Sequence, residues 1–263
     1  ARKAQSMDLI YDKNTFGVAI GGKLTNEEIF LAKSYAEDIL QTENIFNIHK
    51  RKSGLKEVIG VDVSTNTLNE ICHTDAILVF NADLMNDYTI TALKVKSAFE
   101  NGAKIININT KDTKISDWAD ETIITDNGTK ILRDIFVKDS KFSEIIEEQN
   151  KLMFIFDEEN KTYEQEKLIG LIARRYNHIG SPRNGIIKLR KNINSQGLVD
   201  IGVSIDKDKY LEKINKGDIK GLLLLDDKMP SDEILEKLEF VAVLSTHLDE
   251  KTNPAILDKD FSG

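Results

Sequence analysis

Two adjacent carboxylates, Asp226 and Asp227, are placed where acid–base chemistry could occur. They directly follow the apolar run 221–225, which predicts a buried strand, so they would lie at the carboxyl edge of a sheet. Ligands of α/β proteins bind at that edge, and paired acids there are candidates for proton transfer. Paired acids more often only solvate a loop, and both interpretations stay open.

A second segment approaches a phosphate-binding pattern. Residues 17–24, Gly-Val-Ala-Ile-Gly-Gly-Lys-Leu, nearly fit G-x-x-x-x-G-K-[ST], but Leu24 stands where the metal-binding hydroxyl should be. The middle of the segment is also apolar and strand-like, where a phosphate loop should present backbone amides. A strand, a Gly-Gly turn and a helix capped by Thr25 and Glu28 explain the same residues, and we expect this second structure.

Metal-binding residues are few and scattered. The four histidines, His49, His73, His178 and His247, lie far apart in the sequence, and none has a cysteine as a neighbour in a ligand pattern. A zinc site needs about four converging ligands. Cys72, the one cysteine, is expected to be a buried and inert thiol. The sequence therefore predicts no metal site.

Composition narrows the classes of function. The chain has 263 residues, of which 40% are hydrophobic and 30% charged, with a net charge of −8 and a pI near 5.2. Nucleic-acid binding is disfavoured, because neutralising phosphates requires clustered Lys and Arg. No apolar run is long enough to span a bilayer, and no signal peptide is recognisable. With a single cysteine, we expect a cytoplasmic protein, and the initial Ala1 suggests a fragment or a processed chain.

Apolar strands alternate with helical patterns along the sequence. Predicted strands cover 16–20, 76–80, 104–108, 120–124, 153–156, 221–225 and 240–244, and predicted helices pass through 68–71 or begin near 25, 89, 129, 163, 207 and 231. The helix that begins near residue 25 is expected to turn Leu31 and Ile39 inward, and the helix 89–100 is expected to turn Leu93 and Phe99 inward. The alternation predicts an α/β fold with two lobes, 1–145 and 146–263, each a mostly parallel sheet covered by helices.

One stretch carries a family signature. Residues 194–202, Asn-Ser-Gln-Gly-Leu-Val-Asp-Ile-Gly, together with 183–190, resemble the molybdopterin oxidoreductase superfamily, especially formate dehydrogenases and the large iron–sulfur subunit of NADH dehydrogenase. Further matching segments follow the family order: Leu24–Glu28, Thr42–Ile45, Thr74–Val79, Gly102–Ile106, Trp118–Asp120, Gly128–Thr129 and Phe240–Val243. The resemblance runs from about residue 16 to 250. It implies two Rossmann-like lobes with mostly parallel sheets covered by helices.

The departures from the family pattern concern its cofactor. Active members carry a cysteine or selenocysteine that ligates molybdenum or tungsten, whereas this chain has Ile48, which cannot donate, followed by His49, which could. The family's G-x-N-P after its first central strand reads Phe80-Asn81-Ala82-Asp83 here, so the glycine that lets a pterin phosphate approach the backbone is missing. Asp226 and Asp227 would repel a pyrophosphate. The family's N-terminal cluster-binding segment and C-terminal cap domain are also missing from the sequence.

The resemblance and its departures together predict a function. No catalytic residue, no metal ligand and no bound cofactor are expected. The resemblance implies a relict pterin pocket, and the candidates for its residues are Asn81, Asn109, Gly128, Asn194, Gln196 and Gly197. We expect a structural part of an NADH dehydrogenase- or hydrogenase-type electron-transfer complex, whose other subunits or domains carry iron–sulfur clusters and flavin. Neither a nucleic-acid partner nor a direct membrane span is expected.

Two other functions stay open. The first is a divergent catalytic subunit like that of a formate dehydrogenase, which binds molybdopterin and uses His49 or a water to complete the metal site. It predicts a polar cleft between the lobes, lined by Asn81, Asn109, Asn194 and Gln196. The second is a free-standing nucleotide-binding regulator, which the missing G-x-G-x-x-G pattern disfavours.

Overall fold

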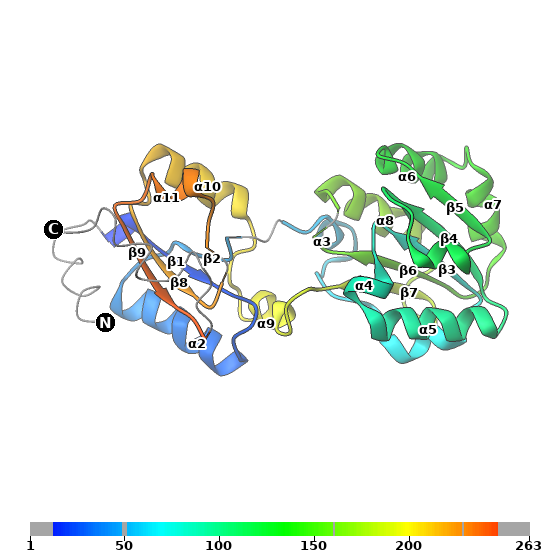
Figure 1. Cartoon of the computed structure of the whole chain (residues 1–263), viewed down its shortest axis with the longest axis horizontal. Coiled ribbons are helices and arrows are strands. Elements are labelled where there is room, and N and C mark those ends of the chain that lie inside the picture. Colours follow the sequence, from blue (N-terminus) through cyan, green and yellow to red (C-terminus); the bar gives the residue numbers. More distant parts are fainter. Residues whose placement is uncertain (1–12, 49–51, 160, 228, 247–263) are drawn as a thin grey trace. The chain divides into compact units, whose positions relative to one another are not determined.

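Two parallel sheets organise the chain (Figure 1). The computed structural model describes residues 13–48, 52–159, 161–227 and 229–246. Within them the chain divides into unit 1, formed by the described parts of 1–52 and 192–263, and unit 2, formed by those of 53–191. All strand pairs are parallel, so the predicted α/β fold with parallel, helix-covered sheets is confirmed.

Unit 2 contains a five-stranded sheet in the order β5-β4-β3-β6-β7. The strands are β3 (Ala76–Phe80), β4 (Lys104–Asn109), β5 (Glu121–Ile124), β6 (Leu152–Asp157) and β7 (Gly185–Leu189). Strands β3 and β6 are buried along their whole length because helices cover both faces of the sheet. This explains why their sequences are continuous apolar runs rather than alternating ones.

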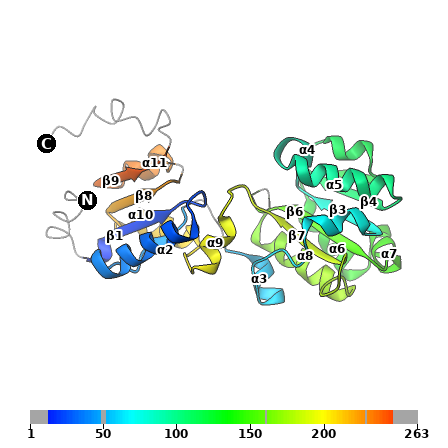
Figure 2. The same cartoon turned by 90° about the horizontal axis from the view of Figure 1, so that it is seen from below.

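The helices of unit 2 form two layers (Figure 2). One face of the sheet packs against α3 (Gly54–Ile59), α6 (Gly128–Val137), α7 (Lys141–Glu148) and α8 (Tyr163–Arg175). The other packs against α4 (Leu84–Asp87), α5 (Thr89–Glu100) and two short 3₁₀ helices, Leu68–His73 and Lys114–Asp117. Trp118 packs against this second core.

Unit 1 contains a four-stranded sheet in the order β2-β1-β8-β9. Its strands are β1 (Phe16–Ile20), β2 (Ile45–Phe46), β8 (Gly221–Leu225) and β9 (Phe240–Leu244). Helices α2 (Asn26–Ser34) and α9 (Ser195–Asp200) cover one face, and α10 (Lys207–Lys216) and α11 (Asp232–Leu235) cover the other. A 3₁₀ turn, Lys13–Thr15, precedes β1, and a π-helical turn, Tyr35–Ile39, extends α2.

The division of the chain differs from the expected lobes 1–145 and 146–263. Strand β6 pairs with β3, and β7 pairs with β6, so residues 146–191 complete the sheet of unit 2. Strand β8 pairs with β1, so the C-terminal part of the chain completes unit 1. Strand pairing between distant segments decides the division, and the alternation of elements along the chain does not reveal it.

Helix α2 begins at the predicted residue, but the residues that it turns toward the sheet differ from those expected. Thr25 caps it through a capping box, with Glu28 Oε2 accepting from the Thr25 amide at 2.8 Å. Leu31 is 70% exposed and Ile39 is 48% exposed, so the expectation that they point inward is wrong. Leu93 and Phe99 of α5 are likewise exposed. Both helices bury small or branched residues against their sheets and carry further large apolar residues outside.

Candidate functional site

The carboxyl edge of the unit 1 sheet is closed by its own backbone. Gly21 follows β1, and its amide donates to the Leu225 carbonyl at the end of β8, at 2.8 Å. A Cβ atom on Gly21 would lie 2.0 Å from the carbonyl oxygen of Asp226. The absence of a side chain at Gly21 therefore lets the two strand ends meet, and the space above the glycine is filled by the chain itself.

The two acids at this edge are engaged in hydrogen bonds. Asp226 is buried, and its Oδ1 accepts from Ser245 Oγ at 3.0 Å and from the Thr246 amide at 3.4 Å. Asp227 Oδ2 accepts from Asn47 Nδ2 at 2.8 Å, and the same nitrogen donates to the Ile20 carbonyl. The carboxylates hold the loops after β1, β2 and β9 in place. Their negative charge at the strand ends opposes a bound phosphate.

The signature stretch lies in unit 1, where it joins α9 to α2. Asn194 Nδ2 donates to the Leu24 carbonyl at 2.8 Å and to Asn26 Oδ1 at 2.9 Å. A Cβ atom on Gly197 would lie 2.2 Å from Asn26 Oδ1 and 2.3 Å from Asn194 Oδ1, so a larger residue would displace these side chains from their contacts. Gln196 donates to Asp200 within the same helix at 2.8 Å. The side chains of these residues are engaged in positioning α2 and α9.

Ile48, which the motif resemblance predicts at the family's metal-ligating place, is part of the core. Ile48 is 4% exposed and belongs to the apolar cluster that includes Phe46 and Tyr210, whose rings stack at 4.2 Å. An aliphatic side chain in that environment offers no donor to a metal. His49, the other candidate for this role, lies outside the described residues.

The remaining candidates meet at the carboxyl edge of the unit 2 sheet. Asn81 follows β3 with a φ of +45°, and its amide donates to the Ile108 carbonyl at 2.9 Å. Asn109 ends β4, and its Nδ2 donates to the Ala82 carbonyl at 3.1 Å. A Cβ atom on Gly128 would lie 2.9 Å from Cζ of the Phe80 ring. Here too the space beside the candidate glycine is occupied by the protein.

An ion pair further occupies this edge. Lys111 Nζ lies 3.0 Å from Asp83 Oδ2, and Asn86 donates to the same oxygen at 2.9 Å. Burial alone would raise the pKa of Asp83, but the hydrogen bonds from Asn86 and Lys111 and the charge of Lys111 lower it. Nearby, burial raises the pKa of Asp157 at the end of β6 and that of Tyr88.

The structure thus separates the six pocket candidates into two groups. Asn81, Asn109 and Gly128 belong to unit 2, whereas Asn194, Gln196 and Gly197 belong to unit 1. A glycine that serves a cofactor leaves room for it above the Cα atom. At Gly128 and Gly197 that room is filled by Phe80 and by Asn26, so the residues present do not fit a pterin phosphate at these points.

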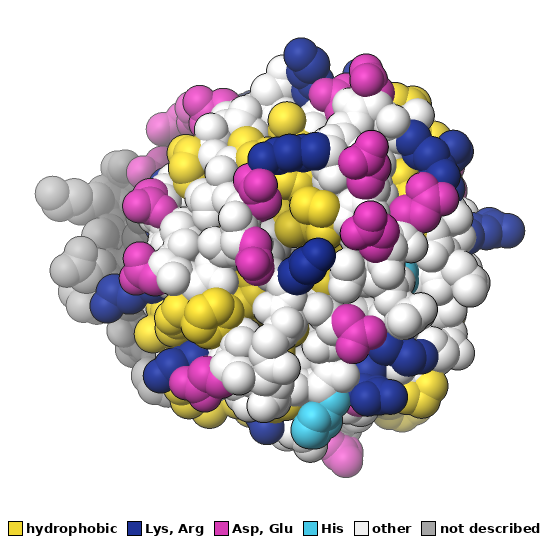
Figure 3. Space-filling model, turned by 90° about the vertical axis from the view of Figure 1, so that its right-hand side faces the viewer, with side chains coloured by type: hydrophobic (Ala, Val, Ile, Leu, Met, Phe, Trp, Pro, Cys, Tyr) yellow, Lys and Arg dark blue, Asp and Glu magenta, His cyan; other side chains and the backbone are white. Residues whose placement is uncertain are grey.

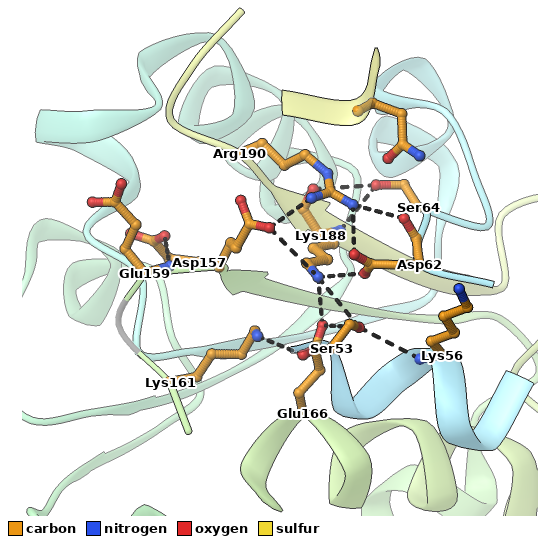
Figure 4. A network of polar contacts seen from close by, with 12 residues as sticks. Ser53, Lys56, Asp62, Ser64, Asp157, Glu159, Lys161, Glu166, Lys188 and Arg190 are labelled. Carbon is orange, nitrogen blue, oxygen red and sulfur yellow. Dashed lines mark hydrogen bonds and ion pairs between the residues drawn. The ribbon is translucent and has the colours of Figure 1, made fainter. Parts of the chain in front are cut away.

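A buried charge network in unit 2 was not predicted from the sequence (Figure 4). It contains three acids and three bases, which are Asp62, Glu158, Glu166, Lys161, Lys188 and Arg190. Lys188 points from β7 to Asp62 and to Glu166, whose Oε1 lies 2.7 Å from the ammonium. Glu166 also accepts from the Gly54 amide at 3.0 Å, at the first residue of α3. The network fastens the segment around α3 to β7 and α8.

The pKa values of Asp62 and Lys161, two members of the network, are both shifted from their usual values. Burial alone would raise the pKa of Asp62, but the charges of Lys188 and Arg190 and the hydrogen bonds it accepts lower it to about 2. Burial lowers the pKa of Lys161, although Glu166 at 2.7 Å counteracts this. A fully buried acid needs such partners, because an isolated charge is costly to desolvate. One sequence signal could have indicated the network, namely two cations, Lys188 and Arg190, within and beside an apolar strand.

The described residues contain neither a cluster of metal-ligating side chains nor a helix fit to span a membrane. Among them, no three His, Cys, Asp or Glu side chains gather as a metal site would require. No helix in the described part of the chain combines the length and apolar character that crossing a bilayer requires.

Comparison with known proteins identifies a family whose profile matches most of the chain. The profile of the family "Molybdopterin oxidoreductase" matches residues 2–255. "F420-dependent formate dehydrogenase 2 subunit alpha" of Methanococcus maripaludis is 28% identical over 101 residues, which are 36% of this chain and 15% of that protein. "Formate dehydrogenase H" of Escherichia coli is 29% identical over 111 residues, 40% of this chain and 16% of that protein. The matched part is therefore a small fraction of either relative.

A solved structure extends the likeness in fold. The formyltransferase/hydrolase complex (FhcABCD) from Methylorubrum extorquens, in complex with methylofuran, contains a chain that superposes with a TM-score of 0.68. The superposition covers 94% of this chain and 79% of that one, at 13% identity, and it concerns the fold alone. With the family profile matching nearly the whole sequence, this chain belongs to the molybdopterin oxidoreductase family.

Proposed function

We propose that this chain is a structural component of a larger redox complex and that it binds no molybdenum or tungsten cofactor. The observation that carries the proposal is the filled space beside its glycines. The positions above Gly21, Gly128 and Gly197 hold Asp226, Phe80 and Asn26. A chain that retains the family fold but packs its own atoms against these glycines has kept the scaffold without the pocket.

The charge and donor set at the two sheet edges support the same proposal. The strand ends of unit 1 carry Asp226 and Asp227, both held by hydrogen bonds. Ile48 fills the core at the place of the metal ligand. Electrons would then pass through iron–sulfur clusters and flavin on other subunits or domains. An NADH dehydrogenase- or hydrogenase-type setting and a cytoplasmic location remain predictions that rest on the motif resemblance and the composition.

Metal and pterin analysis tests the proposal directly. The full-length protein is purified from its own host, molybdenum and tungsten are measured by mass spectrometry, and pterin is measured by fluorescence after oxidation. A formate dehydrogenase purified in parallel serves as the positive control. We expect metal and pterin far below one per chain. Stoichiometric metal together with pterin would refute the proposal.

A second candidate is a divergent catalytic subunit, which the identity to formate dehydrogenases favours. It requires a pterin pocket that the described glycine contacts do not provide. Formate-dependent reduction of a viologen dye, assayed on the same purified protein, separates the two. We expect no formate-dependent rate. A rate that depends on molybdate in the growth medium would establish the catalytic alternative.

A nucleotide-binding regulator receives no support from the segment 17–24. Gly17 to Ile20 form β1, and Phe46 and Ile219 lie close to Gly17. The predicted strand, turn and capped helix are confirmed there. A thermal-shift screen with NAD, NADP and ATP is expected to show no stabilisation.

A further inference from the structure

The outer face of α2 carries large apolar side chains. Phe30 is 65% exposed and Leu31 is 70% exposed, while Ile39, at the end of the following π-helical turn, is 48% exposed. The inner face is supplied by Ile29 and Ala32, which pack on the unit 1 sheet. A helix that is apolar on both sides is typical of one that is covered on both sides. Within the described residues, only the inner side is covered.

The charges around these residues are mostly negative. Glu27, Glu37 and Asp38 are exposed on the same helical stretch. Glu28 is exposed as well, but its carboxylate caps the helix. The one base between residues 26 and 39 is Lys33, whose Nζ donates to the Ile201 carbonyl at 3.0 Å and lies 3.9 Å from Glu37 Oε1, so it offsets part of the charge of Glu37 and leaves those of Glu27 and Asp38. The outer face of α2 is therefore apolar and acidic.

Another face of the chain provides a contrast. Figure 3 shows a face of unit 2 on which apolar side chains lie among Lys, Arg, Asp and Glu together. Mixed charges of this kind are typical of a solvated surface. On α2, Phe30 and Leu31 are adjacent in sequence, and the charges around them are mostly negative.

The sign of the charge excludes several occupants of this face. Nucleic acid and an anionic lipid surface would both be repelled by the acids. A second copy that used the same face would bring acids against acids, because a twofold contact pairs each patch with itself. A surface with apolar residues and a rim of Lys and Arg would complement it.

We propose that the outer face of α2, formed by Phe30, Leu31 and Ile39 with Glu27, Glu37 and Asp38 around them, binds an apolar, Lys/Arg-rimmed surface of another polypeptide. This proposal rests on the proposed role of the chain as a component of a complex and names the chemistry of its neighbour. Aromatic and aliphatic anchors at the centre supply the affinity, and the acids select the partner by charge.

Photo-crosslinking identifies what covers the face. The full-length chain carries p-benzoyl-phenylalanine in place of Leu31, is produced in its own host and is irradiated, and the crosslinked peptide is sequenced. A matched control carries the same residue in place of Leu93 on α5, which is 53% exposed. We expect position 31 to crosslink to a peptide of another polypeptide that is rich in Lys or Arg beside apolar residues. A crosslink to a second copy of this chain, to an acidic peptide or to no protein overturns the proposal.

Substitutions then measure the contact with the identified partner. The double variant Phe30→Ser, Leu31→Ser is expected to weaken binding at least about tenfold, as loss of two interface anchors does. The double variant Glu27→Lys, Asp38→Lys should also weaken it, and the wild-type affinity should fall when salt shortens the Debye length from about 10 to about 3 Å. Glu144→Lys with Glu148→Lys on α7 is the charge-matched control and should bind normally. Unchanged binding by either α2 double variant refutes the proposal.

The two proposals fail in different ways. If the crosslinked complex contains stoichiometric molybdenum and pterin bound to this chain, the proposed function fails while the docking face stands. If the chain is free of cofactor but position 31 finds no basic partner, the docking face fails while the proposed function stands. Circular dichroism of each α2 variant verifies that the helix is intact, so a loss of binding cannot be attributed to unfolding.

Discussion

Replacing Lys188 by Met is expected to destabilise unit 2, because it leaves two buried carboxylates short of a partner. The Lys188 ammonium binds both Asp62 and Glu166, and all three side chains are at most 2% exposed. Removing one member of a buried ion pair costs about 3–5 kcal/mol. Asp62 keeps Arg190 and Glu166 keeps Lys161, which places the expected loss near the lower end, about 3 kcal/mol. This corresponds to roughly a 150-fold change in the unfolding equilibrium.

Urea denaturation followed by tryptophan fluorescence measures this loss. Trp118 is the only tryptophan and packs in the core of unit 2, so its emission reports on that unit. With an m-value of about 2 kcal/mol/M, the midpoint should fall by about 1.5 M. Lys96→Met is the control, because the Lys96–Glu100 pair at 3.6 Å is exposed and should contribute at most about 1 kcal/mol. A Lys188→Met midpoint equal to or above that of the wild type would refute the reasoning.

Three further predictions concern acid stability, packing and capping. The lowered pKa of Asp62 contributes about 2.5 kcal/mol to the free energy of unfolding. This contribution is complete above the usual pKa of 3.8 and is lost as the pH falls through about 2. Asp62→Asn should therefore weaken the loss of stability that urea titrations measure between pH 5 and pH 2. Gly197→Ala should destabilise unit 1 by more than 1 kcal/mol through overpacking, seen as faster amide exchange in α9, whereas Gln196→Ala should change little. Thr25→Ala should cost about 1 kcal/mol and increase exchange at the start of α2, and unchanged exchange there would contradict the capping role.

Local patterns predicted the elements well. The capping box of Thr25 and Glu28 needs only four residues, and it is present as expected. Strands β1, β3 and β8 follow from short apolar runs bounded by polar residues. Strands β2 and β7 are not among the strands predicted from the sequence. β2 has only two residues, and it is a strand because β1 lies beside it.

Long-range contacts escaped prediction for a physical reason. Lys188 and Asp62 are 126 residues apart, and no periodicity links a cation in one strand to an acid after a distant helix. The face of α2 was also undetermined, since Phe30 and Leu31 are as apolar as the residues that point inward. The pocket residues illustrate the same limit. Gly197 matched a motif, but only the position of Asn26 shows that its open side is filled.

The insertion of unit 2 between the two parts of unit 1 has a consequence for synthesis on the ribosome. Strand β1 pairs with the two-residue β2 and with β8, and about 200 residues separate Ile20 from Gly221. At about 5–20 residues per second, β1 waits roughly 10–40 s for its main neighbour. Unit 2 is continuous and can fold during this interval. The apolar side of β1 remains uncovered meanwhile, so the nascent chain should depend on a chaperone more than its native stability alone would indicate.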